Sequence, residues 1–270
     1  MKIGELTKLV DCKKFTNVPL YAHYADNPEV LENMSIDSLV AMDLFTEPAF
    51  AVAIKENGLS VLPSYGGMDL ATFLAKVAAG GDIVLDNNIV LEDYIEIRND
   101  VTINLNGYSI IHPATSKSQY PDVFEVLTGG KLTINGDGEV IAENGYAVYA
   151  SGDAVVTLND GYYFSPVSAV DARKNASVTI NGGVFKVDGT NNPDGDFGQK
   201  FTLNLRDKKG NYVNELSEII VKGGKFYKYN PAASESEPEI TNFVAAGYEA
   251  VADGDWFIVK ELDNIVVDEL

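Results

Sequence analysis

The tetrapeptide Val178-Thr-Ile-Asn181 gives the strongest indication of the fold, because its pattern of an apolar residue, Thr, an apolar residue and Asn recurs along the chain. The other copies are Val101-Thr-Ile-Asn104, Leu132-Thr-Ile-Asn135, Val156-Thr-Leu-Asn159 and Phe201-Thr-Leu-Asn204. Successive asparagines are 31, 24, 22 and 23 residues apart. The five copies therefore form an internal repeat with a period of about 20–25 residues.

A repeat of this length, with Asn and Gly at its corners, is typical of one winding of a parallel β-solenoid. One winding cannot bury its own apolar side chains, so windings stack about 4.8 Å apart and bury them against each other. We expect the apolar residues to point inward, Thr to point outward, and the asparagines to form a ladder of side-chain amides. The alternative is a β-sandwich, in which turns every 8–12 residues or so are expected but identical motifs are not.

A degenerate sixth copy follows at Ile220-Val-Lys222. The glycines after it repeat those after Asn181, since Gly182-Gly183-Val184-Phe185 is echoed by Gly223-Gly224-Lys225-Phe226. We therefore expect this segment to begin another winding.

The chain is predicted to close the solenoid at both ends. Apolar residues at helical spacing, from Leu70 to Val77, predict a helix over residues 68–79 that stops at Gly80-Gly81 and covers the first winding. Large apolar residues are expected to close the last winding: Phe243, Tyr248, Val251, Trp256, Phe257 and Val259. We assign residues 67–230 to the β-helix and residues 231–270 to a C-terminal cap and tail.

Residues 1–66 differ from the repeat and are predicted to form a small mixed region. Asn27 as N-cap and Pro28 in the first turn predict a short helix near residues 28–34. Alternating apolar residues on both sides of Asn57-Gly58 predict a β-hairpin. We expect this region to need the rest of the chain or a partner in order to bury enough surface.

Charge and composition exclude several classes of protein. Forty Asp and Glu residues against 20 Lys and Arg give a formal charge of −20, which repels a nucleic-acid backbone. No apolar run approaches the roughly 20 residues that span a bilayer, and the first residues lack the apolar segment of a signal peptide. Cys12 is the single cysteine, so no internal disulfide is expected. We expect no cofactor and no bound metal ion.

Two parts of the sequence resemble known families. The segments Gly80-Gly-Asp-Ile-Val-Leu85, Ile95-Glu-Ile97 and Val101-Thr-Ile-Asn-Leu-Asn-Gly107 resemble the start of a right-handed β-helix of the pectate-lyase type, and this resemblance covers roughly residues 68–230. The closing block, from Phe226-Tyr-Lys-Tyr-Asn-Pro231 to Gly254-Asp-Trp-Phe-Ile-Val259, is similar to the ends of virion proteins of gut-type tailed bacteriophages. These include head-fibre and other capsid-attached β-helical proteins.

The resemblances imply a fold, a function and a location. The fold is all-β, a right-handed parallel β-helix (solenoid) with an N-terminal capping helix and a small mixed N-terminal anchoring region. The function is that of a structural virion component, a fibre or decoration protein without enzymatic activity that assembles as a homotrimer in the host cytoplasm. Residues 1–66 would attach it to the capsid or to another protein of the phage particle.

Enzymes on this scaffold act on polysaccharides with several carboxylates and a basic residue. Asp171 and Arg173 are predicted to share one face of an extended segment, where we interpret them as an exposed ion pair rather than a catalytic pair. Arg98 and Arg206 are expected on neighbouring windings. We therefore predict no enzymatic activity.

Two further features have an ordinary interpretation. His112, at the start of a polar loop, is interpreted as a surface histidine. Asp194 and Asp196 have a spacing seen in calcium-binding loops, but the frame of an EF-hand is missing, so we interpret them as part of a turn.

Four tyrosines are the candidate contact residues for a glycan or a second subunit: Tyr146, Tyr149, Tyr162 and Tyr163. With Phe164 they are expected on adjacent windings, either as a strip on which sugars stack or as residues packed in the core or between subunits. A second hypothesis for the whole protein follows from the first of these uses. It is a tail-spike-like protein that binds or degrades host surface glycans in a groove lined by loops 112–121 and 188–198.

Overall fold

The computed structural model describes residues 50–55, 58–63, 67–114, 116, 122–187, 201–205, 216–235 and 240–262, with only the backbone described for 50–63 and 234–235. The chain divides into two units, Met1–Met68 and Asp69–Leu270. In the first unit, β1 (Phe50–Lys55) pairs antiparallel with β2 (Gly58–Pro63), and Lys55 lies opposite Gly58. The predicted hairpin is confirmed, whereas the predicted helix near residues 28–34 lies outside the described residues.

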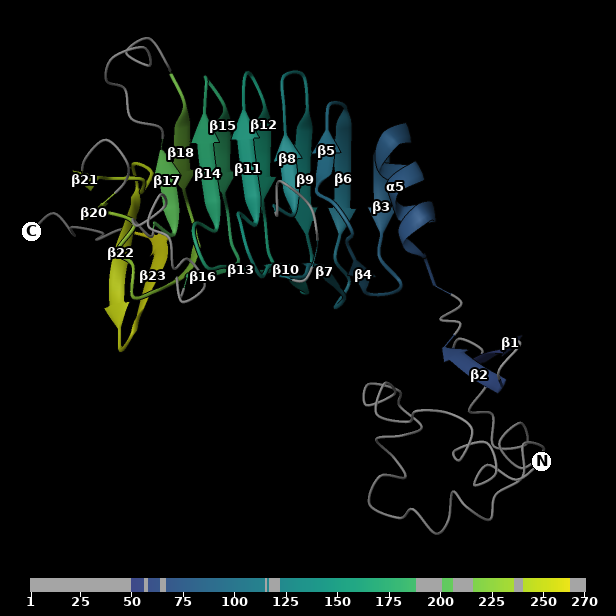
Figure 1. The fold of residues 1–270 in the computed structure, drawn as a ribbon. Coiled ribbons are helices and arrows are strands. Elements are labelled where there is room, and N and C mark those ends of the chain that lie inside the picture. The colour runs from purple at the N-terminus through teal and green to yellow at the C-terminus, as the bar shows by residue number, and fades with distance from the viewer. Residues whose placement is uncertain are drawn as a thin grey trace, which may run out of the picture. The chain divides into compact units, whose positions relative to one another are not determined.

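The second unit is mostly β-structure and contains three sheets with parallel strands (Figure 1). The six-stranded sheet consists of β3 (Gly81–Val84), β6 (Asp100–Asn104), β9 (Lys131–Asn135), β12 (Val155–Leu158), β15 (Ser177–Ile180) and β18 (Glu218–Val221). The five-stranded sheet consists of β5 (Ile95–Ile97), β8 (Phe124–Val126), β11 (Val148–Ser151), β14 (Val170–Arg173) and β17 (Leu203–Leu205).

The eight-stranded sheet has six parallel strands and two antiparallel ones. The parallel strands are β4 (Ile89–Val90), β7 (Ser109–His112), β10 (Glu139–Ala142), β13 (Tyr162–Ser165), β16 (Val184–Val187) and β19 (Gly224–Tyr227). The antiparallel hairpin of β22 (Tyr248–Asp253) and β23 (Trp256–Glu261) adds to β19. A separate short pair consists of β20 (Ser234–Glu235) and β21 (Ile240–Thr241).

Consecutive strands enter the three sheets in a fixed cyclic order. The strands β3, β4 and β5 belong to the six-, eight- and five-stranded sheets, and the same order repeats through β19. Each set of three strands is one winding, and the next winding pairs with it in parallel. The arrangement is that of a parallel β-helix-like fold, and the parallel pairing of the repeated motifs excludes the β-sandwich alternative.

Four copies of the repeated motif stack as predicted in the six-stranded sheet. Residues Val101, Leu132, Val156 and Val178 lie opposite one another on successive strands and are buried. The Thr that follows each of them is half-exposed on the outer face. The asparagine ladder is present in part: Asn159 donates to Asn135 and Asn181 donates to Asn159, both at 2.7 Å.

The assignment of the fifth copy was wrong. Phe201-Thr-Leu-Asn204 overlaps β17 of the five-stranded sheet, where Asn204 lies opposite Asp171 and not next to Asn181. The degenerate copy takes its place in the six-stranded sheet, because Ile220 pairs with Thr179. The alternation of apolar residues fits a strand in any of the three sheets, so the motif alone did not distinguish between them.

A stack of aromatic rings fills the core beneath the eight-stranded sheet. The ring centroids of Tyr163 and Phe185 are 4.8 Å apart, and those of Phe185 and Phe226 are 5.0 Å apart. Gly183, two residues before Phe185, has φ of +100°, and a Cβ there would lie 2.9 Å from the carbonyl oxygen of Gly161. Glycine is required because it permits both the positive φ and this close approach, which explains the repeated Gly-x-aromatic pattern.

The helix predicted over residues 68–79 is confirmed as α5 (Leu70–Ala79). Asp69 is its N-cap and accepts from the backbone N–H of Thr72 at 2.7 Å. Phe73 and Val77 are buried, and the helix contacts the first winding, β3 to β5. It ends at Gly80, which has φ of +80°.

The C-terminal residues pack on the last strands with only part of the predicted apolar set. Phe243 and Val259 are buried, and the carbonyl oxygen of Phe243 accepts from the N–H of Val221 at 2.8 Å. Tyr248, Trp256 and Phe257 are half-buried, whereas Val251 is 38% exposed and points away from the core. Residues 263–270 lie outside the described residues.

Candidate functional site

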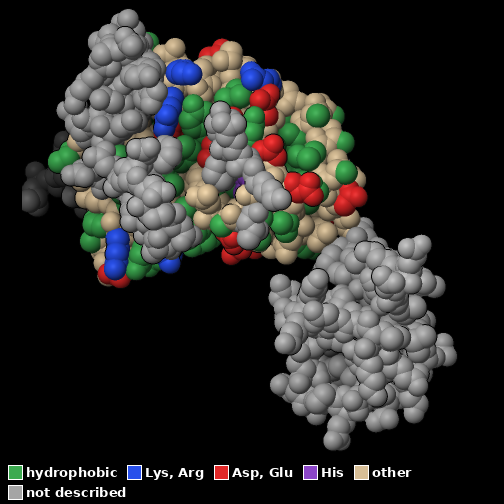
Figure 2. Space-filling model, viewed as in Figure 1, with side chains coloured by type: hydrophobic (Ala, Val, Ile, Leu, Met, Phe, Trp, Pro, Cys, Tyr) green, Lys and Arg blue, Asp and Glu red, His purple; other side chains and the backbone are tan. Residues whose placement is uncertain are grey.

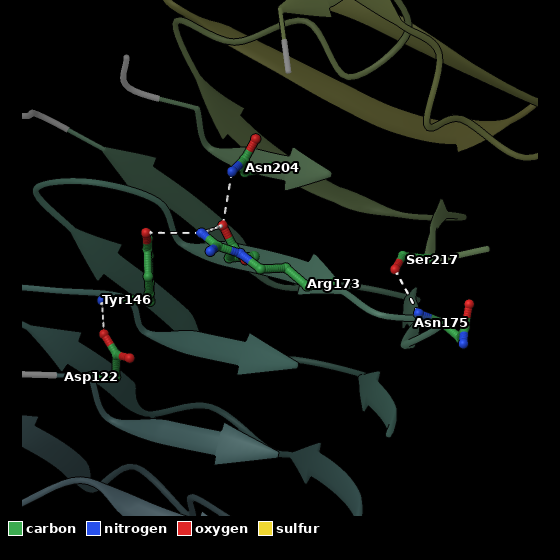
Figure 3. A network of polar contacts seen from close by, with 7 residues as sticks. Asp122, Tyr146, Arg173, Asn175, Asn204 and Ser217 are labelled. Atoms are coloured by element: carbon green, nitrogen blue, oxygen red, sulfur yellow. Dashed lines mark hydrogen bonds and ion pairs between the residues drawn. The ribbon is translucent and has the colours of Figure 1, made fainter. Parts of the chain in front are cut away.

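The outer face of the five-stranded sheet carries a column of polar side chains in register. The pairing of β8, β11, β14 and β17 places Glu125, Tyr149, Asp171 and Asn204 opposite one another. They point away from the core, because their strand neighbours Val126, Ala150 and Ala172 are fully buried on the other face. We call this column and its contacts the polar network; Figure 3 shows the part of it around Arg173, Asn204 and Tyr146.

Asp171 and Arg173 form a bidentate salt bridge at the centre of the polar network. Arg173 Nε lies 2.5 Å from Asp171 Oδ1, and Arg173 Nη2 lies 3.0 Å from Oδ2. Asn204 donates its side-chain amide to the same Oδ2 at 2.8 Å. The Asp171 side chain is fully buried and that of Arg173 is 17% exposed, so the prediction of an exposed pair was wrong.

Two tyrosines complete the surroundings of Arg173. The rings of Tyr146 and Tyr149 are stacked with their centroids 6.0 Å apart, and the guanidinium carbon lies 5.9 Å and 5.4 Å from them. These are cation–π distances, and Arg173 Nη2 also donates to the hydroxyl of Tyr146 at 3.3 Å. Burial alone would lower the pKa of Arg173, but the hydrogen bond and the charge of Asp171 outweigh it and raise that pKa.

Asp122 extends the polar network towards the preceding winding. Its Oδ1 accepts from the backbone N–H of Tyr146 at 2.7 Å (Figure 3), and the residue is only 7% exposed. Burial raises the pKa of Asp122 to about 7, although the hydrogen bond from Tyr146 lowers it; the charges of Glu125 and Asp171 raise it further and that of Arg173 lowers it. Asp122 is therefore partly protonated near neutral pH.

The predicted surface histidine is buried. His112 lies at the end of β7 with its ring directed into the core opposite Ala142, and it is fully covered. Its Nδ1 lies 2.5 Å from the backbone carbonyl oxygen of Asp122, so Nδ1 donates, and Nε2 has no hydrogen-bond partner in the described part of the chain. The sequence already indicated that His112 is buried, because it follows Ile110 by two residues and therefore lies on the same, inner face of the strand.

Acidic side chains gather over the first strands of the five-stranded sheet, as Figure 2 shows. Burial raises the pKa of Glu125, and the charges of Glu96 and Asp93 add to the shift, whereas Arg98 lowers it. Arg98 pairs with Glu96 at 2.5 Å on an exposed part of this surface. Its predicted neighbour Arg206 lies outside the described residues.

The four candidate tyrosines do not form one strip. Tyr146 and Tyr149 belong to the polar network, whereas Tyr162 and Tyr163 lie on β13 in the eight-stranded sheet. Tyr163 is fully buried in the aromatic stack and its hydroxyl donates to the carbonyl oxygen of Asp160 at 2.8 Å, so it offers no surface to a glycan or a subunit. Tyr162 is half-buried on the outer face of the same strand.

Asn175, which follows β14, is hydrogen-bonded to Ser217, which precedes β18. The hydroxyl of Ser217 accepts from the N–H of Asn175 at 3.0 Å (Figure 3), and Oδ1 of Asn175 accepts from the N–H of Leu216 at 2.8 Å. Asn175 has φ of +71°, a conformation that Asn tolerates better than most residues. The predicted turn with Asp194 and Asp196 lies outside the described residues, as does most of loop 112–121.

The contacts of the two buried carboxyl groups, Asp122 and Asp171, limit the acid–base chemistry that they could support. A carboxyl group with a raised pKa near a second carboxyl group is a pattern used by glycosidases. Both oxygens of Asp171 are already occupied, however, and the residue has no exposed surface. Within the described residues, no group of three or more His, Cys, Asp or Glu side chains is placed to hold a metal ion.

None of the helices among the described residues is long and apolar enough to cross a membrane. Comparison with models of protein families, with curated proteins and with solved structures finds no match for this chain.

Proposed function

We propose that this chain is a structural component of a phage particle, a fibre or decoration protein with no enzymatic activity. The observation that carries the proposal is that Asp171, Arg173 and Asn204 are bonded to one another, within one strand and between neighbouring windings. Asp171 on β14 is held by Arg173 on the same strand and by Asn204 on β17. Such contacts stabilise a stack of windings, and both carboxylate oxygens of Asp171 already accept hydrogen bonds from the chain itself.

The proposed fold is a right-handed parallel β-helix, and α5 is its N-terminal cap. The burial of Phe73 and Val77 against the first winding supports a capping role. A cap protects the open strand edge of the first winding, which would otherwise pair with other chains. The asparagine ladder and the aromatic stack repeat from winding to winding, as expected for a scaffold whose role is length and stiffness.

Attachment to the particle is proposed for residues 1–66, with three copies of the chain in each fibre. The division of the chain after Met68 supports a separate role for the N-terminal unit. Assembly takes place in the host cytoplasm, and the finished protein is part of the virion. The acidic surface, with 40 Asp and Glu residues, favours solubility for a protein that projects outward.

The test is to search for the chain in purified phage particles by mass spectrometry with labelled peptides. We expect a fixed number of copies per particle, divisible by three. Purified full-length protein should also bind particles that lack it, and an excess of a fragment containing residues 1–66 should compete for that binding. Absence from particles, or a copy number that varies between preparations, would contradict the proposal.

A glycan-binding or glycan-degrading protein of the tail-spike kind is the second candidate. It is favoured by the stacked pair Tyr146 and Tyr149 beside Asp122, whose pKa is about 7. Sugar rings stack on such aromatic faces, and a protonated carboxyl can act as a general acid. Cleavage of any member of a panel of bacterial surface glycans, lost on Asp122→Asn, would favour this candidate over the structural one.

A further inference from the structure

The outer face of the eight-stranded sheet is apolar along most of its length. A first column of residues in register points away from the core: Val90, Ile111, Ile141, Phe164 and Lys186. Val90 is 55% exposed, and the other four are half-buried. The column continues with Tyr227 and Trp256, because the Lys186 ammonium lies 5.1 Å from the Tyr227 ring centroid and Tyr227 pairs with Trp256.

A second column lies beside the first on the same face. It consists of Ser109, Glu139, Tyr162, Val184, Lys225, Ile258 and Val251. Tyr162, Val184 and Ile258 are half-buried, and Val251 is 38% exposed. Together the two columns define a surface that is about 30 Å long at the usual spacing of strands.

This face differs from the outer faces of the other two sheets. The six-stranded sheet presents a row of threonines next to the asparagine ladder, in which Thr133, Thr157 and Thr179 lie opposite one another. The five-stranded sheet presents the polar network. Parallel sheets are normally covered on both faces. Among the described residues, apolar side chains are most frequent on the outer face of the eight-stranded sheet, whereas the six-stranded sheet exposes Val84 and Val155 beside its polar residues.

The charges on this face are balanced, although the chain as a whole is strongly acidic. Within its strands the acidic residues are Glu139, Glu249 and Asp253, and the basic residues are Lys186, Lys225 and Lys260. Lys260 pairs with Glu249 at 3.3 Å. The whole chain has 40 acidic and 20 basic residues.

We propose that copies of this chain associate side by side through the outer face of the eight-stranded sheet, a proposal that rests on the trimeric fibre proposed above. Copies with a formal charge of −20 repel one another over most of their surface. They can approach closely where charges balance and apolar side chains are exposed. A basic partner would instead favour the acidic surface over β5 and β8.

The distribution of side chains along the face favours a parallel arrangement of the copies. The first windings present Val90, Ile111 and Ile141, and the later windings present Lys186, Lys225 and the aromatic pair Tyr227 and Trp256. A parallel arrangement places apolar residues against apolar residues at the same level. An antiparallel arrangement would place two lysines of one copy against the aliphatic residues of the other and bury their charges.

The first test measures the mass of the full-length chain by light scattering at micromolar concentration. We expect three times the chain mass of 29.2 kDa for the wild type. Phe164→Asp and Ile141→Asp should weaken association by at least about 100-fold and reduce the mass to one chain, because they bury a charge in the contact. Val155→Asp is the matched control: Val155 is 41% exposed on the outer face of the six-stranded sheet, and its variant should keep the wild-type mass.

A second measurement avoids the possibility that an Asp variant misfolds. In a Cys12→Ser background, Phe164→Cys should be linked between copies by a short bismaleimide, whereas Val155→Cys should not. Linkage through position 155 and not through position 164 would overturn the proposal.

The outcomes separate this inference from the fibre proposal. A wild-type trimer that Phe164→Asp and Ile141→Asp leave intact would overturn the assigned face and keep the trimer. A wild type with the mass of one chain would overturn both the assigned face and the trimer. Attachment to the phage particle would still be tested by detecting the chain in purified particles. Capture of a different protein by this face, with no self-association, would also overturn the proposal.

Discussion

Asn204 donates its side-chain amide to Oδ2 of Asp171 across 2.8 Å and so joins β17 to β14 on the outer face of the five-stranded sheet. The repeat predicted Asn204 as a member of the asparagine ladder, but its side chain instead donates a hydrogen bond to a buried carboxylate. Arg173 supplies the counter-charge through two contacts with the same group. A fully buried charge of this kind depends on each of its partners, which makes the polar network sensitive to single substitutions.

Asp171→Asn should lower the free energy of unfolding by about 3–5 kcal/mol, because it leaves the largely buried Arg173 guanidinium without a counter-charge. Urea denaturation followed by circular dichroism measures the change. Glu96→Gln is the matched control, because it breaks a pair in which Arg98 and Glu96 are 56% and 42% exposed. Equal losses in the two variants would show that burial of the ion pair does not matter.

Asn159→Ala should lower the free energy of unfolding by about 1–2 kcal/mol, because it removes two hydrogen bonds of the asparagine ladder. Asn181→Ala removes only one of these two bonds and should cost about half as much. Both substitutions are compared with the wild type in the same denaturation experiment. A loss for Asn159→Ala no larger than that for Asn181→Ala would contradict a continuous ladder.

The sheets, the helix and most of the ladder could be predicted from the sequence, because they depend on local patterns. Alternation with a period of two defines the inner and outer face of each strand, and the copies ending at Asn135, Asn159 and Asn181 have nearly equal spacing. The helix that begins at Leu70 followed from apolar residues at helical spacing and from the glycines after Ala79.

The identity of the sheet that a strand joins could not be predicted in the same way. All three sheets need one apolar face, so the motif at Phe201 to Asn204 fits each of them, and the pairing with β14 places it in the five-stranded sheet. The burial of Asp122 and the covered position of His112 depend on contacts between windings, which a single motif does not contain. For Tyr162 and Tyr163 the information was available, since neighbouring residues of a strand point to opposite faces.

Phe185→Ala should lower the free energy of unfolding by about 3–5 kcal/mol, because it opens a cavity between the rings of Tyr163 and Phe226. Phe185→Leu retains most of the apolar volume and should cost clearly less. Gly183→Ala should also destabilise the protein, because its Cβ would meet the carbonyl oxygen of Gly161 at 2.9 Å. Thermal unfolding of the three variants measures the order of these effects, and a tolerated Phe185→Ala would contradict a continuous stack.

The raised pKa of Asp122 predicts a pH dependence of stability with a definite sign. The folded state holds a proton on Asp122 up to about pH 7, whereas the unfolded state releases it near the ordinary value of 3.8. The contribution of Asp122 to stability is therefore fully present below about pH 4 and is lost as the pH rises to about 7. The loss is on the order of 4 kcal/mol.

Asp122→Asn tests this sign, because an amide can accept the hydrogen bond from Tyr146 without titrating. The free energy of unfolding of the wild type, minus that of the variant, should fall between pH 4 and pH 7 and become constant above pH 8. Glu125→Gln should move the fall to lower pH, because the charge of Glu125 raises the pKa of Asp122. A difference that stays constant from pH 4 to pH 8 would mean that the Asp122 carboxyl is solvated and not buried.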